Sequence, residues 1–235
     1  WHIECSCISM KHLGERLDIH RGGIDNAFPH HTNEIAQSEA YLGHKWCNYW
    51  FHILHLNTNS GKMSKSKGEF LTVSLLESKG YDPLVYRFFC LQSHYRKSLV
   101  FTYENLDNAK TAYNKLTARI AQLMADKKPD EVVELVDFEK FKGSFKAALD
   151  DDINTSNAIT VLYDVLKADT NNETKLALIE DFDKVLSLGL MEAAKKLNSG
   201  EGEEDIPEEV KALVEERKAA RKAKDFAKAD SIRDE

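Results

Sequence analysis

A short run of apolar residues constrains the fold of this chain more than any other feature. From Tyr49 to Leu56 the sequence is Tyr-Trp-Phe-His-Ile-Leu-His-Leu, in which aromatic and β-branched residues dominate. A run of this length and character predicts a buried strand of a parallel sheet. Leu17 to His20 predicts a second short strand. We therefore expect the first part of the chain to be an α/β structure.

A glycine-bounded loop rich in lysine follows that run. Gly61 and Gly68 enclose Lys-Met-Ser-Lys-Ser-Lys, and glycines allow the backbone to approach a ligand closely. The ammonium groups of Lys62, Lys65 and Lys67 can neutralise a triphosphate. A phosphate-binding loop after a buried strand suits a nucleotide site. On composition alone, a solvated basic turn explains the same residues.

A second candidate loop follows Leu17 to His20 and has the sequence Arg-Gly-Gly-Ile-Asp. Ligands of open α/β sheets bind at the carboxyl ends of the strands. Gly22 and Gly23 would let the backbone approach a nucleotide there, and Asp25 would accept a hydrogen bond from a ribose hydroxyl. A plain turn is the alternative.

The segments on either side of this loop have different patterns. Residues 1 to 10 alternate bulky and polar side chains and predict a short strand that runs into a helix. A helix is predicted from Pro29 to Leu42, because its apolar residues have helical spacing and proline suits a first helical position.

Three residues of these segments form a candidate metal site. His30 and Glu34 are four residues apart on one face of the predicted helix. With the thiolate of Cys5 they make a donor set that suits zinc. His31, three residues before Glu34, is an alternative that the spacing leaves open, and exposed histidines at a helix start would explain the same pattern.

The composition indicates a soluble protein. With 42% hydrophobic and 30% charged residues among 235, the chain has no apolar run of about 18 residues that would span a membrane. Its four cysteines are too few and too irregular for a disulfide framework, which favours a reducing compartment. We expect a cytoplasmic location. The net charge of −7 arises largely from local acidic clusters and does not exclude a nucleic-acid partner.

The second half of the chain has helical periodicity. Two short helices are expected over 71–78 and 83–91, and longer amphipathic helices that form an antiparallel bundle are expected over 103–125, 137–149, 154–167 and 171–188. The Gly- and Glu-rich segment 198–209 predicts a mobile linker. A last helix with a basic face then begins near Ile206 and would bind RNA phosphates or be solvated.

Four motifs occur along the chain in a defined order. They are Trp-His-Ile-Glu-Cys-Ser at 1–6, Asp-Ile-His-x-Gly-Gly-Ile-Asp at 18–25, Phe-Pro-His-His-x-Asn-Glu-Ile-Ala-Gln-Ser at 28–38 and Lys-Met-Ser-Lys-Ser at 62–66. In this order and spacing they resemble the cysteinyl-tRNA synthetases, a family of class I aminoacyl-tRNA synthetases.

The resemblance implies a fold and a set of domains. The fold is α/β plus all-α, the C-terminal half of a Rossmann-like catalytic domain followed by an antiparallel helical bundle. The implied domains are a catalytic part with the zinc site at 1–60, the lysine loop with a connecting, stem-contact subdomain at 61–102, the helical bundle at 103–197, and an acidic linker with the start of a tRNA-binding region at 198–235.

The resemblance also implies roles for matched residues in substrate binding. Cys5, His30 and Glu34 would ligate zinc, which selects His30 over His31. Trp1 and His20 would surround the bound cysteine substrate.

On the nucleotide side, the resemblance implies a set of residues that handle ATP. Gly22, Gly23 and Asp25 would contact ATP and the aminoacyl adenylate. Lys65 would bind ATP and act with Lys62 in catalysis.

The activity implied is ATP-dependent activation of L-cysteine, with Mg²⁺, and its ligation to tRNA(Cys) by a monomeric enzyme in protein biosynthesis. Zinc accounts for selectivity, because a steric pocket separates serine from cysteine by only ~1–3 kcal/mol. A serine hydroxyl forms no bond to zinc as strong as the bond that a cysteine thiolate forms.

The sequence departs from the family pattern in several places. The His-Ile-Gly-His signature and a fourth zinc ligand, a cysteine, precede the family position that matches Trp1, and the 235 residues contain neither. We therefore expect the chain to be inactive alone. Arg21 stands where small residues are usual and Thr32 where an acid is usual.

Two other interpretations of the function remain. A cysteine ligase of mycothiol biosynthesis shares the catalytic motifs, although the basic final helix favours a tRNA enzyme. A non-catalytic tRNA-binding fragment is the second alternative.

Overall fold

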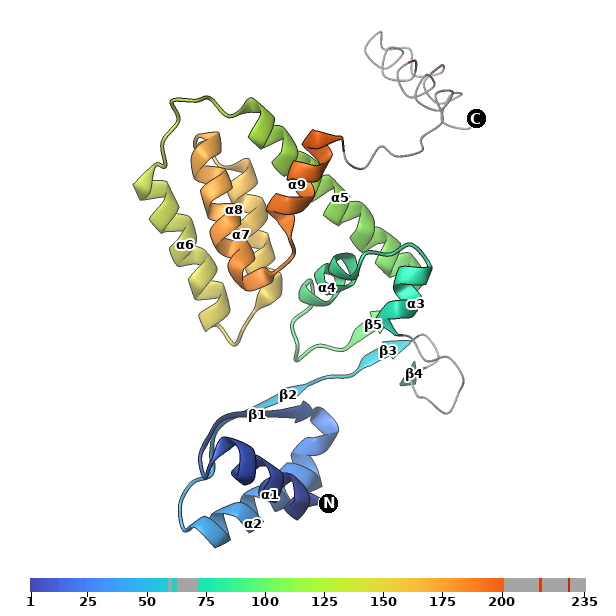
Figure 1. The fold of residues 1–235 in the computed structure, drawn as a ribbon, viewed down its shortest axis with the longest axis vertical. Helices are drawn as coiled ribbons and strands as arrows, with labels where there is room; N and C mark the ends of the chain where they lie inside the picture. Colours follow the sequence, from blue (N-terminus) through green and yellow to red (C-terminus); the bar gives the residue numbers. More distant parts are fainter. Residues whose placement is uncertain (59–60, 63–71, 201–215, 217–227, 229–235) are drawn as a thin grey trace. The chain divides into compact units, whose positions relative to one another are not determined.

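The computed structural model describes residues 1–58, 61–62, 72–200, 216 and 228 (Figure 1). It divides into two compact units, Trp1–Met191 and Glu192–Glu235. The predicted lysine loop lies outside the described residues except for Gly61 and Lys62, and so does the predicted basic helix except for two isolated positions. Among the described residues, no helix is both long and apolar enough to cross a membrane.

The chain begins with two helices and a parallel pair of strands (Figure 1). The elements are α1 (His2–Leu13), β1 (Leu17–Gly23), α2 (Thr32–Leu42) and β2 (Cys47–Ile53). β1 and β2 pair in parallel from Leu17↔Cys47 to Gly23↔Ile53. The predicted parallel strands are therefore confirmed.

A small apolar cluster fixes the helices to the strands. Leu17, Trp46 and Cys47 are buried, and Met10 of α1 and Leu42 of α2 pack against them. This cluster lies at the start of both strands, so the helices and strands are held together at the end opposite the expected ligand site.

The first segment is helical rather than a strand that leads into a helix. α1 begins at His2. Ser6 and Met10, which are four residues apart on this helix, both face inward, and Ser38 of α2 donates a 2.9 Å hydrogen bond to the Ser6 hydroxyl. The prediction of a strand within residues 1 to 10 was wrong, since a four-residue periodicity outweighs the local alternation.

Two further boundaries differ from the prediction. Arg21 to Gly23 continue β1 instead of forming a loop, and the turn begins only at Ile24. The helix expected from Pro29 becomes regular at Thr32, after a five-residue π turn over Ala27–His31. Its irregular start fits the extended backbone of Phe28, since the residue before a proline disfavours helical angles.

One face of the strand pair is largely exposed among the described residues. Tyr49 is 71% and Ile19 65% exposed, and the two are paired in the register. The expected burial of the Tyr49 to Leu56 run on both faces is therefore wrong for the described structure.

A second, three-stranded sheet follows. β3 (Leu56–Thr58) pairs antiparallel with β4 (Gly61–Lys62) and parallel with β5 (Leu99–Phe101). The two predicted short helices are confirmed as α3 (Val73–Ser78) and α4 (Pro83–Leu91). Each has an N-cap side chain, Thr72 and Asp82, that accepts a hydrogen bond from the first turn.

The four predicted bundle helices are confirmed. They are α5 (Tyr103–Asp126), α6 (Leu135–Asp150), α7 (Thr155–Lys167) and α8 (Asn172–Leu186), and α9 (Leu190–Ser199) follows. Phe145 and Phe182 stack with centroids 4.0 Å apart at the contact of α6 with α8. Asn154 and Asn171 cap α7 and α8.

Side chains that donate to helix-end carbonyls connect α4 to the bundle. Arg87 Nε donates to the carbonyl of Leu186 at 2.6 Å, and Thr155 Oγ1 donates to the carbonyl of Leu91 at 2.8 Å. Both carbonyls lie in last helical turns, which otherwise lack intrahelical partners.

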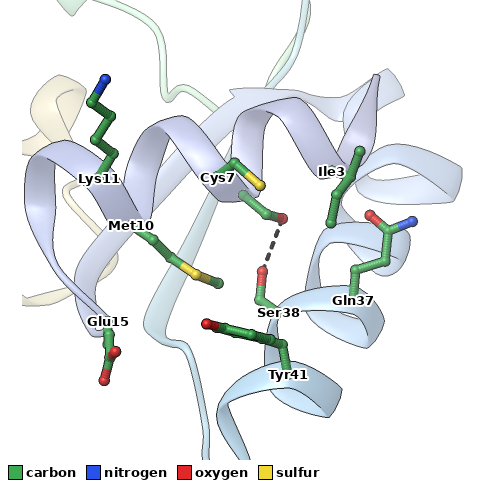
Figure 2. A pocket seen from close by; sticks show the side chains of 9 residues that line it. Ile3, Cys7, Met10, Lys11, Glu15, Gln37, Ser38 and Tyr41 are labelled. Atoms are coloured by element: carbon green, nitrogen blue, oxygen red, sulfur yellow. Dashed lines mark hydrogen bonds between the residues drawn. The ribbon is translucent and has the colours of Figure 1, made fainter.

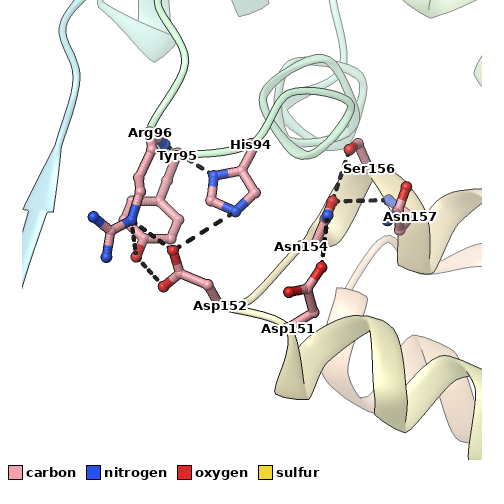
Figure 3. Close-up of polar contacts among 8 residues, drawn as sticks. All are labelled: His94, Tyr95, Arg96, Asp151, Asp152, Asn154, Ser156 and Asn157. Atoms are coloured by element: carbon pink, nitrogen blue, oxygen red, sulfur yellow. Dashed lines mark hydrogen bonds and ion pairs between the residues drawn. The ribbon is translucent and has the colours of Figure 1, made fainter.

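A polar cluster joins the segment after α4 to the turn between α6 and α7 (Figure 3). Arg96 Nε lies 2.5 Å from Asp152 Oδ2, and the Tyr95 hydroxyl donates to the same carboxylate. Asp152 and Ile153 both have positive φ, a conformation that costs free energy in non-glycine residues. The cluster thus holds a strained turn in place.

Candidate metal and substrate site

Glu34 is the centre of the candidate site. It lies in the first turn of α2 and its side chain is fully buried. One carboxylate oxygen, Oε2, accepts a 2.6 Å hydrogen bond from His20 Nε2 of β1. The other, Oε1, lies 2.7 Å from His30 Nε2. A carboxylate taken so fully out of water needs compensation by hydrogen bonds, a counter-charge or a metal.

The contact on Oε1 does not meet this need as a hydrogen bond. Although it is short, it is not aligned as one, and Glu34 Oε1 has no hydrogen-bond partner in the described structure. A ring nitrogen and a carboxylate oxygen that meet without a hydrogen bond would both be available as ligands for one cation.

Cys5 completes this convergence. Its thiol, a ring nitrogen of His30 and a carboxylate oxygen of Glu34 all lie within 4.8 Å of one another. Thiolate, imidazole and carboxylate are the ligand types of zinc in proteins. The orphaned buried oxygen and this donor set both fit a divalent metal of borderline softness.

His31 belongs to a second possible group. His20, His31 and Glu34 also place their ligand atoms within 4.8 Å of one another, and the two groups share Glu34. Because this group contains no thiol, it suits a soft metal less well. The sequence alternatives His30 and His31 therefore fall into two different groups that share the Glu34 carboxylate.

The protonation states follow from burial. Burial and the nearby Glu34 carboxylate raise the pKa of the Cys5 thiol, so a cation is needed to hold it as thiolate. Burial, followed by the positive charge that His20 can carry, lowers the pKa of His31 to about 4, which keeps its imidazole neutral at pH 7.

Two histidines in the site were not predicted as functional. His2 Nδ1 lies 2.6 Å from His30 Nδ1, and His52 Nε2 lies 2.8 Å from His31 Nδ1. On a helix, His2 and Cys5 are three residues apart and share a face. A correct helix prediction for the first segment would therefore have indicated His2.

Neighbouring side chains leave no room for a Cβ at either of the two predicted glycines. A Cβ on Gly22 would lie 2.8 Å from both Asn26 Nδ2 and His31 Cε1, and a Cβ on Gly23 would lie 2.5 Å from Asp25 Oδ1. Asp25 also lies 3.6 Å from His55 Nε2. The structure thus brings the glycines and Asp25 together near the carboxyl end of β1.

The remaining predicted residues are placed only in part. Trp1 is 83% exposed, at the start of α1. The backbone of Lys62 lies in β4, and Lys65 lies outside the described residues. Nothing in the described structure brings the lysines to the metal ligands.

A separate pocket of about 420 Å³ lies between α1 and α2 (Figure 2). Its lining includes Cys7, Met10 and Tyr41, together with the hydrogen-bonded Ser6 and Ser38. None of the predicted site residues lines it, so it is distinct from the candidate metal site.

Comparisons with family models and with curated proteins point to the same family. Residues 1–111 match the model described as tRNA synthetases class I (C) catalytic domain, and residues 144–190 match the DALR domain. Three curated relatives are named cysteine–tRNA ligase. They come from Brevibacillus brevis (41% identical over 253 residues), Bacillus cereus (41% over 250) and Bacillus thuringiensis (42% over 251).

The matches to the curated relatives cover this chain more completely than they cover the relatives. Each comparison covers 100% of this chain and 52% of the relative. The chain therefore spans about half the length of the curated relatives it matches.

Proposed function

This chain belongs to the family of the cysteine–tRNA ligases, and we propose that it serves ATP-dependent activation of L-cysteine and ligation of cysteine to tRNA(Cys). It contains part of a class I synthetase catalytic domain followed by a DALR helical domain. The domain boundaries that we propose lie near 60, 102 and 197, and the DALR match falls inside the proposed bundle domain 103–197.

The observation that carries the proposal is the convergence of Cys5, His30 and Glu34 around a buried oxygen without a hydrogen-bond partner. We assign these residues as zinc ligands. Bound zinc would supply a position for the thiolate of the cysteine substrate, which the hydroxyl of serine fills poorly. His20 would hold Glu34 through Oε2, while His20 and Trp1 would border the substrate.

The nucleotide side of the proposal rests on the motifs. Gly22, Gly23 and Asp25 would contact ATP and the adenylate. Lys62 and Lys65 would stabilise negative charge as pyrophosphate leaves the α-phosphate, with Mg²⁺ on the phosphates.

The metal assignment is tested by cysteine replacement. We expect the chain to bind about one zinc per molecule and Cys5→Ser to lose most of that affinity, since a hydroxyl is a poor zinc ligand. Cys7→Ser is the matched control, because Cys7 lies on the same helix and is exposed. The measurement is competition with a chromophoric chelator. Equal zinc affinity of Cys5→Ser and the unchanged chain would refute the assignment.

The activity is tested by cysteine-dependent exchange between pyrophosphate and ATP. We expect no exchange from the 235-residue chain alone, because its sequence lacks a His-Ile-Gly-His motif. A full-length chimera, in which this chain replaces the matched half of the Brevibacillus brevis relative, should show exchange. Turnover by the isolated chain would contradict the first expectation. A folded chimera that responds to no amino acid, or to serine equally, would contradict the proposed function.

A further inference from the structure

Both ring nitrogens of His30 are engaged in the described structure. Nε2 faces Glu34 Oε1 at 2.7 Å, and a ring nitrogen of His30 lies within 4.8 Å of the Cys5 thiol. Nδ1 faces His2 Nδ1 at 2.6 Å. The two rings are tilted by 54° with centroids 4.8 Å apart, so they meet through their nitrogens rather than by stacking.

The contact between His2 and His30 constrains the tautomer of His30. Two ring nitrogens at 2.6 Å share one hydrogen, so one of them donates and the other accepts. If His30 Nδ1 carries the hydrogen, its Nε2 presents a lone pair toward Cys5 and Glu34. Imidazoles that bind metals almost always donate their second N–H to a neighbouring acceptor.

His2 is placed to be that acceptor and not a ligand itself. Neither group of convergent ligand atoms found in the described part of the chain includes His2. It comes from the first turn of α1, the helix that also carries Cys5. One helix thus supplies both a metal ligand and the side chain that orients the histidine ligand from the other side.

We propose that His2 is a positioning residue for the metal site, which accepts a hydrogen bond from His30 Nδ1 and so directs the Nε2 lone pair of His30 to the metal. The proposal rests on the proposed zinc site of Cys5, His30 and Glu34. It adds a residue that does not touch the metal but sets its affinity.

The test measures Zn²⁺ affinity of the 235-residue chain by chelator competition for three variants. His2→Ala removes the acceptor and should weaken affinity by about 10–100-fold. His2→Asn keeps an acceptor oxygen near the position of Nδ1 and should stay close to the unchanged chain. His12→Ala is the matched control, an exposed histidine on the same helix.

Two further measurements separate orientation from unfolding and from direct ligation. Thermal unfolding of the metal-free chains should be the same for His2→Ala and His2→Asn. The Co²⁺ visible and thiolate charge-transfer spectra should be alike for all variants at saturation, because the ligands are unchanged.

The outcomes distinguish this inference from the zinc site on which it rests. Weak binding by His2→Ala with near-normal binding by His2→Asn supports it. Equal affinities of His2→Ala and the unchanged chain would overturn it and leave the zinc site intact. A changed Co²⁺ spectrum in His2→Ala would also overturn it, since His2 would then be a ligand. Absence of Zn²⁺ binding by the unchanged chain would overturn the zinc site first and the role of His2 with it.

Discussion

Gly22 lies where β1 passes closest to the buried imidazole of His31. The Nδ1 of that ring contacts His52 Nε2 at 2.8 Å, which limits how far the ring can give way. The need for glycine here comes from the space that His31 and Asn26 occupy. This requirement exists whether or not a nucleotide also approaches the backbone.

Replacement of this glycine should therefore be costly. Gly22→Ala would place its Cβ 2.8 Å from His31 Cε1, and we expect a loss of about 1–3 kcal/mol in the free energy of unfolding, the range for overpacking. Gly143→Ala is the control, because a Cβ there meets nothing within 4 Å and lies within α6. It should stabilise by about 0.5–1 kcal/mol. Urea unfolding of both variants measures the difference, and equal stabilities would refute the steric explanation.

At the scale of elements, the sequence predicted those whose periodicity is long enough to be unambiguous. The helices α5 to α8 repeat their apolar residues over several turns, and their predicted bounds agree closely with those observed. α1 was mispredicted because its inward residues, Ser6 and Met10, include a polar side chain that only its hydrogen bond to Ser38 makes suitable for burial. That bond joins residues far apart in the sequence and leaves no local signal.

The candidate site likewise contains residues that the sequence predicts and residues that it does not. Ligand type and spacing predicted Cys5, Glu34 and one of His30 and His31, and only the family resemblance selected His30. The structure brings Cys5, His30 and Glu34 together. His2 and His52 were not, because each meets its partner across more than 20 residues of sequence, at separations of 28 and 21. A contact of this kind depends on how α1 and β2 pack against the turn before α2.

Contacts between α6 and α8 predict a pH dependence of stability. Burial alone raises the pKa of Asp181, but hydrogen bonds and charges from Lys142 at 3.1 Å and Lys184 at 3.2 Å outweigh it and hold the pKa below its usual range. A carboxyl with a lowered folded pKa stabilises above its unfolded pKa and loses that contribution as the pH falls through the folded pKa.

We therefore expect the stability difference between the unchanged chain and Asp181→Asn to be largest at neutral pH and to shrink below about pH 4. Its size should be about 0.2–1 kcal/mol, because the side chains of Lys142 and Lys184 are 48% and 70% exposed and water screens both ion pairs. Urea unfolding from about pH 3 to 7 measures it, with Asp164→Asn, an exposed aspartate on α7, as the control. A difference that grows in acid would contradict the assignment.

At the scale of the whole molecule, the domain boundary that we propose near position 103 is crossed by several hydrogen bonds and ion pairs. Arg87 of α4 donates a hydrogen bond to the carbonyl of Leu186, and Thr155 donates one to the carbonyl of Leu91. Tyr95 and Arg96, which precede β5, hold the turn at Asp152. Both α4 and the connection that follows it are thus joined to the bundle.

These crossing bonds have a consequence for cooperativity. Elements that share buried contacts open together, and hydrogen exchange then reports one cooperative unit in place of two. The end of the catalytic-domain match at residue 111 falls inside α5, which is a single continuous helix. We expect α4, β5 and α5 to α8 to exchange their amide hydrogens as one unit, so that an evolutionary domain boundary here is not a boundary of local unfolding.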